Sequence, residues 1–321
     1  MMNPFAKTAP SLQKKNRSLG RSGKTMRVIL AFAACVLIWG TTWYAIEWQL
    51  GHVPKEWSLT YRYFIAAAVI VAWCFYKKLP MRYTRRQHLF MLGAGLFLFS
   101  GNYLLVYWGT EYLTSALVAI TFSLLTLFNI VNARLFLGVD IQANTVFSAF
   151  LGVVGLILIF KPEIQAFNST DDTTLGLVIC IGATLVASWG NTVIATKAVS
   201  KLPLLPFNAW AMVYGALLNL AFAIVQGTPP SLDPRPEYYI SLLYLSVAGT
   251  VVAFSLYLWL LSEIGVARAS YTAVMTPLVA LLVSTLFEGY LWSVYAAIGV
   301  GFVLLGNLLM SLRKLEVGTK N

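Results

Sequence analysis

The sequence predicts an all-α membrane protein, and three observations lead to that prediction. First, 59% of the 321 residues are hydrophobic and only 11% are charged, whereas about 25% of the residues of a soluble domain are charged. Second, the apolar residues form runs of about 20, the length that a helix needs to cross a bilayer. Third, 23 Lys and Arg residues outnumber 12 Asp and Glu residues and gather between those runs. This placement favours a membrane protein over a nucleic-acid-binding protein.

The runs predict ten transmembrane helices. Their continuous Leu, Ala and Gly content favours helices over the alternating strands of a barrel. Short joints rich in Gly and Pro separate many of them and force consecutive helices to lie antiparallel. The expected spans are residues 28–48, 58–76, 89–108, 113–136, 145–160, 174–197, 207–226, 238–261, 269–287 and 292–311.

The basic residues predict the orientation of these spans. With the N-terminus inside, 19 of the Lys and Arg residues fall on the inside and 4 on the outside, in accord with the positive-inside rule. Both termini are therefore expected in the cytoplasm of a multi-pass protein of the plasma (inner) membrane. Residues 1–26 form a polar, basic segment that we expect to be a disordered tail, and residues 313–321 form a second cytoplasmic tail.

Similar segments recur in the two sets of five spans. Because five is odd, homologous halves must cross the membrane in opposite orientations, so we expect two inverted repeats, residues 27–161 and 174–312. Inverted repeats are typical of secondary transporters. The matching segments are Trp39-Gly40-Thr41-Thr42 with Trp189-Gly190-Asn191-Thr192 at an offset of 150, residues 114–119 with 268–273 at 154, and Ser148 and Gly155 with Gly299 and Gly306 at 151.

A second set of motifs indicates a known family. They are Ile38-Trp39-Gly40-Thr41-Thr42, Tyr61-Arg62-Tyr63-Phe64, Gly101-Asn102-Tyr103 with Tyr112, Ala273 to Pro277, Phe287-Glu288-Gly289, and Gly299 to Gly306. With these motifs the chain resembles the drug/metabolite transporter superfamily, specifically its EamA-type members, over residues 28–312. The resemblance implies two five-span repeats, outward transport, and peripheral spans five and ten that can serve as a pairing surface. The first repeat departs from the second, because Ser123 and Leu137 stand where Pro277 and Glu288 would correspond.

Aromatic and polar residues at helical spacing within the spans predict a substrate-binding cavity. Trp39, Thr42 and Trp43 share one face of the first span. An aromatic lining suits amphipathic organic solutes, including cations, although helix packing and interfacial anchoring are alternative roles. The candidate binding residues are Trp39, Thr42, Trp43, Tyr103, Tyr107, Trp189, Asn191, Trp210, Tyr214, Tyr257, Tyr271 and Met275.

Three further residues are candidates for gating and coupling. Pro277 lies within the ninth span, where a proline removes a backbone hydrogen bond and favours a kink. Glu47 and Glu288 are the best carboxylates for proton coupling, because ionisable residues within spans are costly and usually functional. The other charges near span ends, Arg62 included, are expected to reach the interface or to pair there.

The expected function is that of a secondary transporter, an exporter of a small organic metabolite that works by alternating access. An amino acid, amine, nucleoside or drug-like solute fits an aromatic cavity. No P-loop, His-Glu-x-x-His or Gly-x-Ser-x-Gly pattern occurs, so we expect no cofactor, no metal and no enzymatic activity. The alternatives are a membrane enzyme acting on a lipid-linked substrate and a receptor without transport.

Expected partners are the substrate and the lipid bilayer, with a proton as candidate coupling ion and no nucleic acid. The chain is expected to be a monomer or a homodimer through spans five and ten.

Overall fold

The computed structural model describes residues 9–138, 143–159, 161, 172–269 and 271–317, and these residues form helices joined by short turns, without a strand. The first half comprises α1 (Ala9–Glu47), α2 (Lys55–Tyr76), α3 (Arg85–Ala94), η1 (Gly95–Gly101), α4 (Asn102–Gly109), α5 (Ser115–Thr121), η2 (Phe122–Leu124), α6 (Leu125–Leu137) and α7 (Ala143–Ile159). The second half comprises α9 (Asp172–Ala195), α10 (Leu204–Val225), α11 (Pro236–Leu243), η3 (Tyr244–Val252), α12 (Ala253–Ala269), α13 (Tyr271–Phe287) and α14 (Val294–Val317).

Each apolar run of the sequence overlaps a helix in the part of the chain that the structure describes. Among the described residues, seven helical stretches are long and apolar enough to cross a membrane, and shorter apolar stretches lie in α7, α13 and α14. The observed helices extend beyond several expected spans. α1 begins at Ala9, inside the segment expected to be a disordered tail, and α12 continues to Ala269.

Three of the expected spans are interrupted by a change of helix type. The third span contains the π-helical segment η1 and the eighth contains η3, at positions separated by nearly the repeat offset of 150. Asn219 of α10 donates a hydrogen bond to the Phe99 carbonyl of η1 at 3.0 Å and accepts one from Ser100 Oγ at 2.7 Å. Side chains that insert into the ladder in this way accompany π-helical turns. The fourth span changes to a 3₁₀-helix at η2, which contains Ser123.

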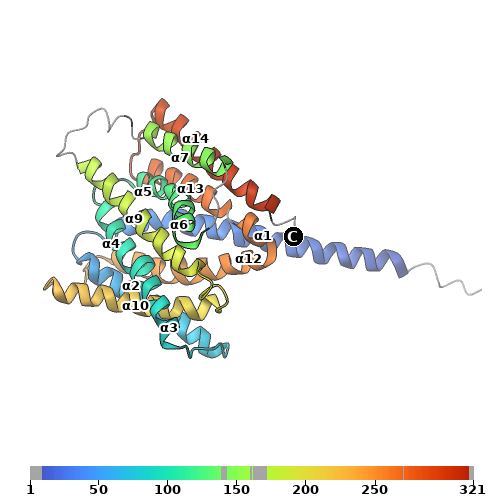
Figure 1. Ribbon diagram of the computed structural model, residues 1–321, viewed down its shortest axis with the longest axis horizontal. Helices are drawn as coiled ribbons and strands as arrows, with labels where there is room; N and C mark the ends of the chain where they lie inside the picture. Colours follow the sequence, from blue (N-terminus) through green and yellow to red (C-terminus); the bar gives the residue numbers. More distant parts are fainter. Residues whose placement is uncertain (1–8, 139–142, 160, 162–171, 270, 318–321) are drawn as a thin grey trace, which may run out of the picture.

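Contacts between the halves follow a reciprocal pattern. α2 packs against α10, and α7 against α14, while the α1–α13 contact is matched by a contact of α9 with α5 and α6. Figure 1 shows α7 and α14 side by side at one edge of the bundle, with α10 on the opposite side. Each contact therefore has a counterpart when the two halves are exchanged.

The α7–α14 contact depends on residues without bulky side chains. A Cβ atom on Gly155 would lie 2.5 Å from the Gly299 carbonyl oxygen, and one on Gly299 would lie 2.5 Å from the Gly155 carbonyl oxygen. Likewise, a Cβ on Gly306 would lie 2.5 Å from the Ser148 carbonyl oxygen. The small residues of spans five and ten thus face one another within the chain, where they let the two backbones approach closely.

Candidate functional site

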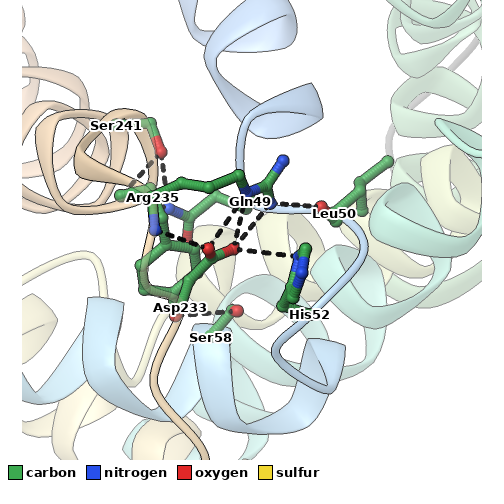
Figure 2. A network of polar contacts seen from close by, with 8 residues as sticks. Gln49, Leu50, His52, Ser58, Asp233, Arg235 and Ser241 are labelled. Atoms are coloured by element: carbon green, nitrogen blue, oxygen red, sulfur yellow. Dashed lines mark hydrogen bonds and ion pairs between the residues drawn. The ribbon is translucent and has the colours of Figure 1, made fainter.

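A network of polar contacts joins the two halves at one end of the bundle, which we call the distal end: α1 and α10 end there, and α2 and α11 begin there (Figure 2). Arg235 donates hydrogen bonds to both carboxylate oxygens of Asp233 at 2.6–3.0 Å and to the Leu50 carbonyl at 2.9 Å. His52 Nδ1 lies 3.7 Å from Asp233. The bonds from Arg235 hold the pKa of Asp233 below its usual value, so this carboxylate stays charged at neutral pH and binds the two joints together.

Gln49, which Figure 2 shows beside Arg235, and the buried Tyr238 extend this network. Gln49 Nε2 donates to the Tyr238 carbonyl at 2.9 Å and to Ser241 Oγ at 2.6 Å, and the Tyr238 hydroxyl lies 3.0 Å from Ser58 Oγ. All four side chains are buried. These pairs could not be predicted from the sequence, because each contact joins segments separated by more than 150 residues. We call these residues, together with Leu50, His52, Asp233 and Arg235, the distal network.

Two carboxyl groups meet beside the distal network. Glu47, the last residue of α1, and Glu288, which follows α13, lie within hydrogen-bonding reach of each other. Ser115 at the start of α5 donates its backbone N–H to Glu288 Oε1 at 2.9 Å and its hydroxyl to Oε2. A hydrogen bond between two carboxyl groups requires a proton on one of them. The structure therefore brings together the two glutamates that the sequence singled out separately.

Three predicted binding residues gather where α1 meets η3 and α12. Trp39 Nε1 donates to the Gly249 carbonyl of η3 at 3.2 Å, and its ring packs 5.3 Å from that of Tyr257. Thr42 also lies against η3: a Cβ atom added to Gly249 would come 2.9 Å from the methyl group of Thr42. Trp39, Thr42 and Tyr257 therefore belong to one cluster with contributions from both halves.

Trp43 faces the 3₁₀ segment of the fourth span. Its ring lies 4.8 Å from that of Phe122, and its Nε1 is buried without a hydrogen-bond partner. The neighbouring Ser123 hydroxyl is also buried without a partner. Pro277, which corresponds to Ser123 in the repeat, is buried inside α13, where Gly40 lets α1 approach the α13 backbone closely. The corresponding helices of the two halves thus both depart from a regular α-helix at this level. The fourth span does so through the 3₁₀ turn that contains Ser123, and α13 through Pro277.

Tyr103 and Tyr107 surround a buried arginine on α2. The Arg62 guanidinium lies 4.5 Å from the centre of the Tyr103 ring and 5.3 Å from that of Tyr63. Tyr107 is fully buried and interacts with Arg62. Arg62 itself is only 2% exposed, which contradicts the expectation that it reaches the interface. Hydropathy could not reveal this, because Arg62 lies only seven residues after the first residue of α2.

Trp189 lines a separate apolar cavity. The cavity has a volume of about 320 Å³ and lies between η1, α6 and α9. Trp189 is 37% exposed and packs 5.8 Å from the Phe97 ring. The other lining residues are Phe136, Leu137, Thr192, Val193 and Thr196.

Trp210 and Tyr214 lie around His88 in a further cluster. The Tyr214 hydroxyl is 3.0 Å from His88 Nδ1, and the Trp210 ring is 5.0 Å from the imidazole. Trp210 Nε1 donates to the Met81 carbonyl at 3.1 Å, in the joint before α3. These contacts place both aromatic residues where α10 meets the start of α3.

The remaining predicted binding residues are dispersed. Asn191 donates to Asn129 Oδ1 at 3.3 Å, and Met275 is 41% exposed. The Tyr271 side chain lies outside what the structure describes. The predicted residues thus form several clusters instead of one lining. No group of three His, Cys, Asp or Glu residues suited to a metal ion occurs in the described part of the chain.

Comparison with known protein families finds the same family twice, once in each half of the chain. The EamA-like transporter family matches residues 26–161 and, again, residues 175–312. The chain belongs to this family. Membership and the apolar helices make it a multi-pass membrane protein of a transporter family.

Relatives of this EamA-like protein extend over most of its length. It is 24% identical to the uncharacterized transporter YoaV of Bacillus subtilis over 80% of this chain and 87% of the relative. It is 22% identical to the uncharacterized inner membrane transporter YedA of Escherichia coli K12, over 88% of this chain and 90% of the relative. A protein crystal structure superposes with a TM-score of 0.65 at 17% identity, over 90% of this chain and 98% of the other, which shows a shared fold.

Proposed function

We propose that this protein is a secondary transporter that exports a small organic metabolite across the inner membrane by alternating access. In this proposal ten spans form two inverted repeats and both termini are cytoplasmic, so that the distal end faces outward. The inner-membrane location is supported by the name of the relative YedA and the termini by the excess of basic residues. The outward direction rests on the resemblance to EamA-type members.

The observation that carries the proposal is the distal network. Its hydrogen bonds and ion pairs link the joint after α1 with the joint and helix after α10, and thus one half with the other. Alternating access requires contacts of this kind, which close one side of the bundle and separate when one repeat rocks against the other. The aromatic and arginine clusters lie deeper along the same helices, where a solute would be enclosed.

The Glu47–Glu288 pair supports a proton as the coupling ion. Carboxyl groups held together near a pathway can take up and release a proton as the helices move. The pair joins α1 to the end of α13, two helices from opposite halves. Loss or gain of the shared proton would therefore act directly on an interface between the repeats.

The proposal is tested by flux measurements in proteoliposomes with labelled amino acids, nucleosides and amines, with and without a pH gradient. Saturable counterflow of one class establishes a carrier and names its substrate class. Accumulation that depends on the gradient establishes proton coupling. If folded protein moves no member of the panel, the transport proposal loses its support and a receptor without transport becomes the better account. The oligomeric state, a monomer or a homodimer through spans five and ten, is a separate prediction.

A further inference from the structure

Arg62 is a buried cation without an anionic partner. It lies on α2, and its Nε and Nη1 atoms are shielded from solvent and make no hydrogen bond. Its neighbours are the rings of Tyr63 and Tyr103. Ring faces attract a cation, but they cannot accept the directed hydrogen bonds that a guanidinium offers.

Four carboxylates described near the distal end are engaged elsewhere, and neither Glu56 at the start of α2 nor Glu237 at the start of α11 makes an ion pair with Arg62. Glu111 pairs with Lys55 at 2.6 Å, and Asp233 pairs with Arg235 at 2.6 Å. Glu47 and Glu288 interact with each other. Within the described ranges, no Asp or Glu makes an ion pair with Arg62.

A second polar group lies beside the guanidinium. Tyr107 Oη is fully buried and lies within reach of the Arg62 guanidinium, but the two groups do not meet normal hydrogen-bond geometry. A buried donor left unpaired is costly, and a buried charge more so. Arg62 and Tyr107 together therefore offer donors for an acceptor that the chain itself does not supply.

We propose that Arg62 binds the carboxylate group of the transported solute, with the Tyr107 hydroxyl as a second donor. The fork of the guanidinium matches a carboxylate with two parallel hydrogen bonds. Arg62 is the single cation in this cluster as far as the structure describes it, which suits a carboxylate with one charge better than a phosphate with two. The inference rests on the proposed transport function and narrows its substrate class.

The distal network lies one turn from this site. Ser58, which bonds to Tyr238 of the other half, precedes Arg62 by four residues on the same face of α2. Opening the contact between Ser58 and Tyr238 would therefore expose the arginine site to the distal side.

Counterflow into two sets of proteoliposomes, one loaded with an unlabelled mixture of amino acids and hydroxy acids and one with an unlabelled mixture of amines and nucleosides, tests the inference. Labelled leucine and lactate are compared with leucinamide and isopentylamine, which lack the carboxylate, and with inorganic phosphate. The wild type is expected to move a carboxylate and to be inhibited by carboxylates at least about tenfold more strongly than by their amides. Arg62→Gln is expected to lose that preference, and Arg62→Lys to retain part of it. Arg86→Gln, which alters an exposed arginine in α3, is expected to behave like the wild type.

Tyr107→Phe keeps the buried ring and tests the site without removing the charge. We expect it to weaken inhibition by carboxylates several-fold and to leave inhibition by amides unchanged. Transport of amines or nucleosides without any carboxylate would overturn the inference while the transporter proposal stands. An unchanged carboxylate preference in Arg62→Gln would also overturn the inference. If Arg62→Gln does not fold, an unchanged preference in both Tyr107→Phe and Arg62→Lys would overturn it. Preference for phosphate would assign the site to another oxyanion and would also overturn it.

Discussion

Glu47 lies in the first quarter of the sequence and Glu288 near its end, yet their carboxyl groups meet. The sequence identified each as a carboxylate at the end of a span, because charge and hydropathy are visible residue by residue. It could not pair them, since no spacing rule relates the first helix to the ninth. The same limit applies to Arg62, whose burial depends on aromatic residues of α4 that meet α2 only in the folded bundle.

At this scale we predict that the glutamate pair is needed for coupling and not for exchange. Glu47→Gln or Glu288→Gln removes the site that holds the proton, so accumulation driven by a pH gradient should fall by about tenfold or more. Counterflow without a gradient should continue. Glu111→Gln, at a glutamate that pairs with Lys55, is the matched control. Accumulation by both pair variants at the wild-type level would contradict the assignment.

At the scale of helices, the sequence predicted where helices lie better than where they begin and end. Every expected span overlaps a described helical stretch, because long apolar runs are typical of membrane helices. Seven of the described stretches are long and apolar enough to cross a membrane. The π-helical segments η1 and η3 and the 3₁₀ turn η2 were not predicted. They depend on partners such as Asn219, which bonds to the Phe99 carbonyl from another helix, and hydropathy does not record such contacts.

The packing of α7 against α14 gives a prediction about stability. Gly155→Ala would place a methyl group against the backbone of Gly299, so we expect a loss of about 1–3 kcal/mol, seen as a lower thermal midpoint in detergent. Gly152→Ala in the same helix meets open space and should leave the midpoint unchanged or slightly higher. Equal midpoints for the two variants would show that this contact is not as close as described.

Pro277 gives a prediction about the rate of the transport cycle. If the hydrogen bond missing at Pro277 lets α13 flex during rocking, Pro277→Ala should slow turnover more than it weakens binding, because it restores that backbone hydrogen bond and stiffens the helix. The maximal rate and the half-saturating concentration of counterflow measure the two effects separately. A change in half-saturation alone would assign the proline a fixed structural role.

At the scale of the whole molecule, the two halves are held together at the distal end by contacts that the proposed transport cycle must break. The sequence predicted two related halves from short repeated motifs, and the family matches each half separately. It did not predict the distal network, because the residues of the joints show neither the helical periodicity nor the repeated motifs on which the sequence argument relied. The central claim is that this network opens and closes during each cycle.

Cross-linking the distal network tests that claim most directly. His52 and Arg235 come from opposite halves, both lie at the Asp233 carboxylate, and their side chains are exposed, so the double variant His52→Cys/Arg235→Cys can be joined by a short, cleavable bismaleimide. The native cysteines are buried, and the two single variants control for modification alone. We predict that cross-linking stops counterflow and that cleavage of the linker restores it. Counterflow at an undiminished rate in fully cross-linked protein would contradict alternating access through this end of the bundle.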